Sequence, residues 1–241
     1  CYSNSTPTQL FDNLTDEDVA KFLDKIMKLG HGSILEHVVF TFAIEDISRV
    51  TEIQLCRHRT ASPSIQSGRY VRRNPHFYLP HEIKNDEVAY QLYMEECERA
   101  TKTYLDLIDR LERVHVSKNL GVSITETYKL ECITEDGESV SVYEKERAKV
   151  EKKALEDARY VLPQALRTHA VYTLDLRNLI HLLSKRKCKR AQEEVREVAN
   201  QMYTEIEPLL KNISKYIGAP CEFGKCPEGT MTCGKPYKMK L

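Results

Sequence analysis

The stretch RHRTASPSIQSGRY, residues 57–70, concentrates cationic and hydroxyl side chains in one short segment. Its first three residues are Arg-His-Arg; Ser67 follows after a spacer of seven residues, and Arg69 lies two positions later. Residues 57–73 contain five arginines and no acidic residue. A guanidinium group donates two parallel hydrogen bonds to phosphate oxygens, and a hydroxyl or the backbone N–H of Gly68 can fill the remaining acceptor positions. The segment therefore predicts an anion-binding site, with a solvated basic edge as the alternative.

The residues before this segment predict a helix. In DISRVTEIQLCRHR, residues 46–59, apolar residues recur at helical spacing, and either Asp46 or Ser48 could cap the helix. Gln54, Arg57 and His58 would share one face of that helix, because Arg57 and His58 lie three and four residues after Gln54.

The residues after the Arg-His-Arg motif predict a strand over QSGRYVRR, residues 66–73. Side chains two residues apart on a strand point to the same face. Ser67, Arg69 and Val71 would therefore face together, which would bring a hydroxyl and a guanidinium to one ligand.

Length and composition agree with a soluble enzyme that has a single domain. The 241 residues are 41% hydrophobic and 30% charged, and no apolar run reaches the length of about 18 residues needed to span a membrane. The formal net charge is zero, which argues against a general polyanion binder. Eight cysteines without a signal-like apolar segment favour reduced thiols in the cytoplasm.

Three of the cysteines lie in a Gly- and Pro-containing C-terminal tail, residues 219–241. Cys221, Cys226 and Cys233 lack the paired C-x2-C spacing of a zinc ribbon, and a fourth ligand is not evident. We therefore expect no metal and a tail of unknown role, with a metal site as the minority alternative.

The first half of the chain mixes helix and strand patterns. Thr15 and Asp18 resemble a capping pair for a helix over 16–29 that stops at Gly30. The alternation in 37–45 predicts a strand with Val38, Phe40, Phe42 and Ile44 on one face. A long helix is expected over 86–113, followed by a hairpin insertion over about 115–147 that turns at Asp136-Gly137.

The second half is mainly helical. KKALEDARYVLPQ predicts a helix closed by Pro163, with Arg159 in its last turn. Asp175 could cap a helix on which Arg177 and His181, four residues apart, face one ligand. A further helix is expected over 191–213, with Leu209 in its apolar stripe. Together these patterns predict an α+β, mixed α/β fold.

The motif of Arg-His-Arg, seven residues and Ser67 resembles the signature of the flavin-dependent thymidylate synthases, the ThyX family. Other stretches resemble the same family in the same order: CYS at 1–3, GHGSILEHVVFTF at 30–42, EDARYVLP at 156–163, LDLRNLIHLLSKR at 174–186 and AQEEV at 191–195. The resemblance implies a catalytic domain over 1–218, lacking the strand that usually opens it. It also implies a central sheet covered by long helices and a flavin site that is not Rossmann-like, in agreement with the absence of a G-x-G-x-x-G element.

The resemblance further implies an activity. Members of the family methylate dUMP to dTMP, with 5,10-methylenetetrahydrofolate as the carbon donor and FADH2, reduced by NADPH, as the hydride donor. They form homotetramers that share active sites between subunits. Similar activity would make small molecules the partners of this chain, rather than a membrane or a nucleic acid.

Site residues are carried over from the family position by position. For dUMP the resemblance implies Gln54, Arg57, Gln66, Ser67, Gly68, Arg69, Arg159 and Arg186. For FAD it implies His31, Ser33, Arg57, His58, Arg59, Ile65, Asp175, Arg177 and His181. Arg186 is the implied catalytic residue, because a guanidinium can lower the pKa of uracil N3–H or stabilise charge on the ring. Ser67 is assigned to substrate binding, because a serine without an adjacent base is a poor nucleophile.

Two positions depart from the family pattern, and two other functions stay open. Ile65 stands where many members have glutamate, and Asp175 where they have asparagine; these changes raise the possibility of a flavin-binding but inactive homologue. The other alternative is a nucleic-acid-binding module that uses Arg57–Arg73 and Lys185–Arg190. It predicts binding that falls steeply with salt, and the zero net charge argues against it.

Overall fold

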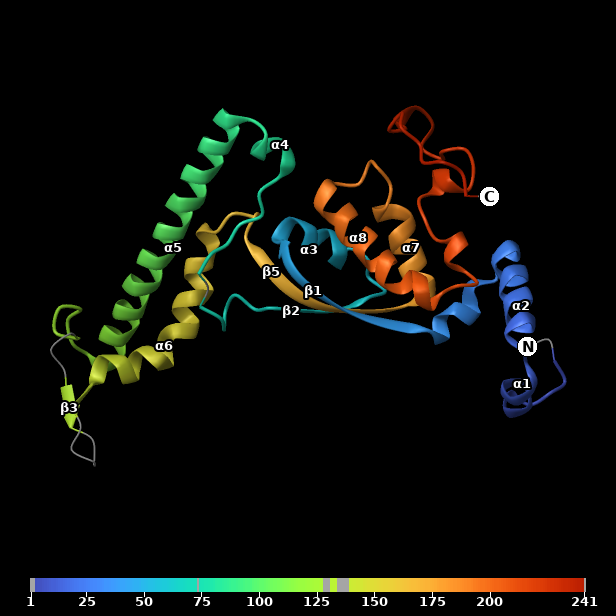
Figure 1. Cartoon of the computed structure of the whole chain (residues 1–241). Coiled ribbons are helices and arrows are strands. Elements are labelled where there is room, and N and C mark those ends of the chain that lie inside the picture. Colours follow the sequence, from blue (N-terminus) through green and yellow to red (C-terminus); the bar gives the residue numbers. More distant parts are fainter. Residues whose placement is uncertain (1–2, 73, 128–130, 134–138, 241) are drawn as a thin grey trace. The chain divides into compact units, whose positions relative to one another are not determined.

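The computed structural model describes residues 3–72, 74–127, 131–133 and 139–240, and it contains helices and two small sheets (Figure 1). A three-stranded sheet has the order β1 (Val39–Ser48), β5 (Arg167–Asp175) and β2 (Ser62–Ile65). A separate two-stranded sheet pairs β3 (Glu131–Ile133) with β4 (Ser139–Ser141). This mixture of helix and strand confirms the α+β class. Helices covering the central sheet stay a prediction.

The chain divides into two compact units. Unit 1 comprises Cys1–Ala43, Ile53–Pro63 and Val171–Leu241, and unit 2 comprises Ile44–Glu52 and Ser64–Ala170. The boundary predicted between a catalytic domain and a tail at residue 218 stays a prediction.

Unit 1 begins with α1 (Pro7–Asn13), α2 (Asp16–Leu29) and the 3-10 helix η1 (Gly32–His37). Helix α2 begins and ends where the sequence predicts. The Thr15 hydroxyl accepts a hydrogen bond from the Asp18 N–H, and the Asp18 carboxylate accepts one from the Thr15 N–H. Gly30 ends the helix at φ 70°, a left-handed conformation that glycine adopts readily because it has no Cβ.

The core of unit 1 lies between α7 (Leu176–Arg186) and α8 (Glu193–Ile206). The buried side chains of the two helices are mainly aliphatic: Leu176, Leu179, Leu182, Leu183, Val195, Val198, Ala199, Met202 and Ile206. The prediction that the last helix continues to residue 213 is wrong, because Pro208 has no N–H to continue the ladder and the chain forms the 3-10 turn η4 (Glu207–Leu209). Leu209 is consequently 72% exposed and does not belong to the core. The chain then forms three more 3-10 turns, η5 (Ser214–Tyr216), η6 (Pro220–Glu222) and η7 (Gly229–Met231).

Unit 2 contains α4 (His81–Lys84), α5 (Glu87–Leu120) and α6 (Val142–Ala158), with α6 continued by the 3-10 turn η3 (Arg159–Val161). The start predicted for the long helix is confirmed, because the Asp86 carboxylate accepts from the Ala89 N–H at 2.8 Å. Its predicted end is too early, since the helix runs on to Gly121 at φ 67°. Helices α5 and α6 pack on each other through Tyr104, Ile108, Val116, Tyr143, Val150, Leu155 and Ala158. None of the helices in the described part of the chain is long and apolar enough to cross a membrane.

The predicted hairpin is confirmed in its strands. β3 and β4 are antiparallel, with Cys132 opposite Val140. The insertion is shorter than predicted, because residues 115–120 belong to α5 and residues from 142 onward belong to α6. The predicted turn at Asp136-Gly137 lies outside the described residues, as do Cys1 and Tyr2 of the CYS stretch and Arg73.

The junction between β1 and α3 (Arg49–Cys56) decides between the two predicted caps. Ser48 is the cap, because its hydroxyl accepts from the Thr51 N–H at 3.1 Å. Asp46 is not a cap: it lies within β1 at φ 56°, where its N–H donates to His169 Nδ1 at 3.2 Å and its carbonyl accepts from Arg167 Nη1 at 3.0 Å. Before this irregularity Phe40, Phe42 and Ile44 alternate with more exposed neighbours, as predicted, whereas Val38 is exposed and precedes the strand.

A buried carboxylate joins three segments of unit 2. The Glu112 side chain on α5 is only 1% exposed. It accepts hydrogen bonds from Arg72 Nη1 at 3.3 Å and from Arg147 Nε, on α6, at 2.9 Å. Breaking a buried ion pair from one side is costly, because the remaining charges lose both solvent and partner.

We predict that Glu112→Ala lowers the free energy of unfolding by about 3 kcal/mol, measured by urea denaturation. Glu96→Ala is the matched control, because its pair with Arg99 on the same helix is exposed at 53% and 70%; a loss below about 1 kcal/mol is expected. Equal losses in the two variants would contradict the role assigned to Glu112.

Candidate functional site

Arg186, the last residue of α7, is fixed by three hydrogen bonds within unit 1. Its Nε donates to His58 Nε2 at 3.1 Å, its Nη1 to Gln54 Oε1 at 3.3 Å, and its Nη2 to the Gln54 backbone carbonyl at 3.1 Å. The predicted common helical face of Gln54, Arg57 and His58 is wrong, because α3 ends at Cys56 and Arg57 and His58 lie in the turn that follows. Gln54 and His58 nevertheless both contact Arg186. Because all three acceptors are neutral, these bonds orient the guanidinium without neutralising its charge.

Burial and neighbouring charge act on the Arg186 guanidinium together. Burial lowers its pKa, and the positive charge of Arg57 lowers it further. An arginine starts from so high a pKa that it stays protonated at neutral pH. A half-buried, oriented cation results, which is the environment in which a positive charge acts most strongly on a bound ligand.

His58 is neutral at physiological pH. Burial, then the charge of Arg186, and then His181 lower its pKa to about 4. Since its Nε2 accepts from Arg186, the neutral ring carries its proton on Nδ1. The ring also lies edge-on to the exposed His181 ring of α7, with 6.2 Å between the ring centroids.

Tyr172 anchors the end of α3, a contact that no motif in the sequence predicts. Its buried hydroxyl donates to the Leu55 backbone carbonyl at 2.8 Å, and burial raises its pKa to about 12. Leu55 adjoins Gln54 in the chain, so this bond stabilises the backbone that Arg186 contacts. Tyr172 and Leu174 are two residues apart on β5, and this alternation predicts that both side chains are buried. It does not predict the hydrogen bond of the Tyr172 hydroxyl.

A second group of predicted residues lies where α7 begins. Arg177 packs against the backbone of η1: a Cβ added to Gly32 would lie 3.4 Å from Arg177 Nε. Its Nη1 also pairs with Glu36 Oε1 at 2.5 Å. The exposed residues His31 and Ser33 flank Gly32 in the chain. The structure therefore brings Arg177 together with this stretch, as the assignment of these residues to one ligand requires.

Asp175 caps α7, as predicted. Its Oδ1 accepts from the Asn178 N–H at 2.9 Å, and its Oδ2 accepts from the Asn178 side-chain amide at 2.5 Å. Both carboxylate oxygens are thus engaged, which offsets the cost of placing a negative charge at this partly buried position.

Ser67 and Arg69 belong to unit 2, and the strand predicted over 66–73 is wrong. The strand is β2 (Ser62–Ile65), and the pairing continues only through the Gln66 N–H, which donates to the His169 carbonyl at 3.0 Å. The chain then turns, because the Ser67 hydroxyl accepts from the Arg69 N–H at 3.2 Å and the Ser67 carbonyl accepts from the Val71 N–H at 3.3 Å. A serine side chain that bonds the backbone two residues on favours a turn over a strand.

Arg159 lies beside this turn. A Cβ added to Gly68 would be 3.7 Å from Arg159 Cδ, and Arg159 Nε donates to the Glu156 carbonyl at 3.2 Å. The Glu156 carboxylate lies 3.5 Å from Arg69 Nη1. The predicted grouping of Ser67, Arg69 and Arg159 is therefore present within unit 2. Glu156 was not among the predicted site residues. Its position three residues before Arg159 on a predicted helix places the two side chains on one face and could have indicated its role.

The remaining predicted residues occupy the edges of these groups. Arg57 and Arg59 are exposed cations of unit 1, in the turn after α3. Ile65 and Gln66 are partly buried in unit 2, at the end of β2. The predicted site residues are thus distributed over both units.

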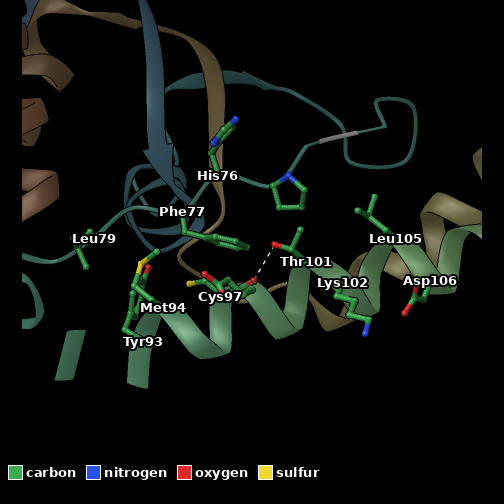
Figure 2. A pocket seen from close by; sticks show the side chains of 12 residues that line it. His76, Phe77, Leu79, Tyr93, Met94, Cys97, Thr101, Lys102, Leu105 and Asp106 are labelled. Atoms are coloured by element: carbon green, nitrogen blue, oxygen red, sulfur yellow. Dashed lines mark hydrogen bonds between the residues drawn. The ribbon is translucent and has the colours of Figure 1, made fainter. Parts of the chain in front are cut away.

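A cavity of about 550 Å³ in unit 2 has a different chemistry (Figure 2). It lies between residues 75–79 and α5, and Phe77, Met94 and Cys97 line it with mainly apolar surface. The Thr101 hydroxyl in its wall donates to the Cys97 carbonyl of the same helix at 2.8 Å. The cavity therefore lacks the cation-rich character of the two groups above.

The cysteines of the tail are free thiols, and the described residues hold no group of three His, Cys, Asp or Glu side chains placed to bind a metal ion. The cationic groups around Arg186 and Arg177 in unit 1, and the group around Arg69 in unit 2, are therefore separate candidate sites.

Comparison with known proteins identifies the family. The family model described as thymidylate synthase complementing protein, Thy1, matches residues 1–210. The chain belongs to the Thy1 family. The match covers each Thy1-like stretch noted in the sequence, from CYS to AQEEV, and confirms the resemblance.

Several relatives of this chain are named flavin-dependent thymidylate synthase. A Clostridium tetani protein named flavin-dependent thymidylate synthase is 38% identical over 100% of this chain and 87% of its own length. Proteins of the same name from Geobacter sulfurreducens and Thermococcus onnurineus are 36% and 35% identical, over 100% and 95% of this chain and 87% and 81% of their own lengths.

We predict that His58 titrates near pH 4 in the folded protein, measured by NMR of its ring carbons. The pKa of His58 in the folded protein lies below its ordinary value of 6.5, so the unfolded chain binds the proton first as pH falls. His58 therefore makes folding less favourable as pH falls from about 6.5 to 4. Arg186→Ala should raise the His58 pKa, because it removes a nearby positive charge. An unchanged pKa in that variant would contradict the contact between the two residues.

Proposed function

We propose that this Thy1-family chain is a flavin-dependent thymidylate synthase that converts dUMP to dTMP. The observation that carries the proposal is Arg186, a half-buried cation oriented by Gln54 and His58 at the position where the ThyX pattern has its uracil-activating arginine. Further support comes from the relatives named flavin-dependent thymidylate synthase that match nearly the whole chain.

The donor set of unit 1 fits FAD. Arg57 and Arg59 are exposed cations suited to a pyrophosphate, and Arg177 lies against the backbone between His31 and Ser33. His58 and His181 supply hydrogen-bonding rings beside them. When bound and reduced by NADPH, the flavin supplies the hydride that completes the methyl group, while methylenetetrahydrofolate supplies the carbon. The proposed site uses no Rossmann element.

Arg186 has the catalytic role. Its guanidinium donates to the uracil ring and stabilises the negative charge that develops there, which makes C5 a better nucleophile toward the one-carbon unit. Three neutral acceptors hold it in place, so its charge is available to the ligand. His58 stays neutral and does not compete with Arg186 for a developing anion.

Ser67, Gly68, Arg69 and Arg159 form the proposed phosphate subsite of unit 2. The turn at Ser67 presents backbone N–H groups and a hydroxyl, and the two arginines lie beside it. Glu156 pairs with Arg69 at 3.5 Å. Binding of the dUMP phosphate exchanges this carboxylate for a dianion, which is a stronger acceptor for a guanidinium.

The proposal includes a homotetramer with active sites shared between subunits and a cytoplasmic location. Size-exclusion chromatography with light scattering measures the first directly. A monomer that nevertheless makes dTMP would remove the shared-site part of the proposal.

The purified protein is expected to bind added FAD and to form dTMP from dUMP, methylenetetrahydrofolate and NADPH. Arg186→Ala should lower kcat by about 100-fold or more, the typical effect of removing a donor that stabilises transition-state charge. Lys185→Ala is the matched control, since it removes an exposed cation one residue away. FAD binding without any dTMP would instead indicate an inactive homologue.

Arg69→Ala should raise KM for dUMP by about 10-fold or more, because a charge-assisted hydrogen bond to phosphate is lost. Activity toward deoxyuridine, which has no phosphate, should be low and unaffected. Glu156→Gln should lower KM for dUMP, since it removes the competing carboxylate. Arg99→Ala on α5 serves as the control for lost surface charge; equal effects of Arg69→Ala on both substrates would remove Arg69 from the phosphate subsite.

A further inference from the structure

The C-terminal tail, residues 219–240, folds back on the segment that follows Arg186 (Figure 1). The Tyr237 hydroxyl donates to the Lys187 carbonyl at 3.0 Å. Lys187 is the C-cap of α7 and directly follows Arg186. A helix leaves its last carbonyls without partners inside the helix, so the tail supplies a donor where α7 cannot.

The Tyr237 side chain is itself held in place. Its backbone N–H donates to Cys221 Sγ at 3.5 Å, and Lys189 Nζ lies 4.4 Å from the centre of its ring. Burial raises the pKa of the phenol, so the hydroxyl keeps the proton that it donates to Lys187.

A second anchor fixes the end of the tail. Lys240 Nζ pairs with Glu222 Oε2 at 2.9 Å and donates to the Ile217 carbonyl at 2.9 Å, and its backbone N–H donates to the Glu222 carbonyl at 2.8 Å. Glu222 is 6% exposed and accepts from the Ala219 N–H at 2.7 Å. A Cβ added to Gly218 would lie 2.5 Å from Glu222 Oε1, so a larger residue there would displace the Glu222 carboxylate.

The tail also forms a wall of a cavity that Arg186 lines. This cavity of about 340 Å³ has Arg186 and Cys188 from the end of α7 and the following segment, and Cys221 and Cys226 from the tail. An ion pair between Arg190 Nη1 and Glu228 Oε2 at 2.7 Å joins the two sides. The tail thus contacts the segment carrying Arg186 at Lys187, Lys189 and Arg190, while the Thy1 family model ends at residue 210.

We propose that the tail is a positioning element for Arg186, and that Tyr237 is the residue through which it acts. Tyr237 holds the carbonyl of the residue after Arg186, which fixes where α7 ends and hence where the guanidinium lies relative to Gln54 and His58. The consequence for catalysis rests on the function proposed above; the structural effect on Arg186 does not.

Tyr237→Phe tests this inference, because it removes the hydroxyl and keeps the ring. We expect kcat/KM for dUMP to fall about 3- to 10-fold, the effect of one lost neutral hydrogen bond. We also expect the His58 pKa, measured by NMR in the full-length protein without flavin, to rise because Arg186 is held less closely. Tyr216→Phe is the matched control, since it removes a hydroxyl that donates to Asp24 instead.

The same substitution in the Arg186→Ala background separates positioning from a general structural effect. If Tyr237 acts through Arg186, Tyr237→Phe shifts the His58 pKa in the parent and causes no further shift when Arg186 is absent. No shift in the parent, or an equal shift in both backgrounds, overturns the inference. A parent that makes no dTMP would defeat the proposed function, whereas the His58 titration would still decide the role of Tyr237.

Discussion

The hydrogen bonds of Arg186 to Gln54 and His58 are the constraint on which the candidate site depends. A charged group loses favourable hydration when it is partly buried, so its hydrogen-bonding capacity has to be filled by the protein. Here neutral acceptors fill it, and the positive charge is kept. The arrangement requires that α3 and α7 end at fixed places, which the buried leucines of α7 and the bond from Tyr172 to Leu55 provide.

Several arginines of unit 2 pair with carboxylates, whereas the acceptors of Arg186 are neutral. Arg72 and Arg147 share the buried carboxylate of Glu112, and Arg69 has Glu156 as its partner. The pairing with Glu112 is enclosed and structural, because only 1% of that side chain is exposed. The contact with Glu156 is longer and more open, so its geometry suits a partner that a ligand replaces. Two arginines of the same short segment therefore have different surroundings: Arg69 has an open partner, and Arg72 has a buried one. The number of arginines in the segment does not predict this difference.

Local signals in the sequence predicted the fold well where a side chain acts on its own backbone. The caps at Thr15 and Asp175 were of this kind, and so were the glycine that ends α2 and the proline after α6. The strand predicted at 66–73 failed because the Ser67 hydroxyl favours a turn, and α8 ended early because Pro208 interrupts it. Contacts between residues far apart in the sequence, such as those of Tyr172 and of Tyr237, had no local signal. The site residues came from family resemblance, whereas only the structure revealed the partners that orient them.

The low pKa of His58 keeps the charge of the His58–Arg186 pair constant over a wide pH range. His58 gains its proton only near pH 4, and the guanidinium of Arg186 keeps its own throughout the neutral and moderately alkaline range. Between these limits the pair always carries one positive charge, located on Arg186. A change in reaction rate with pH in that interval therefore originates outside the pair, in the ligands or in other side chains. In the proposed synthase, the charge of the catalytic guanidinium is therefore the same at every pH within this interval.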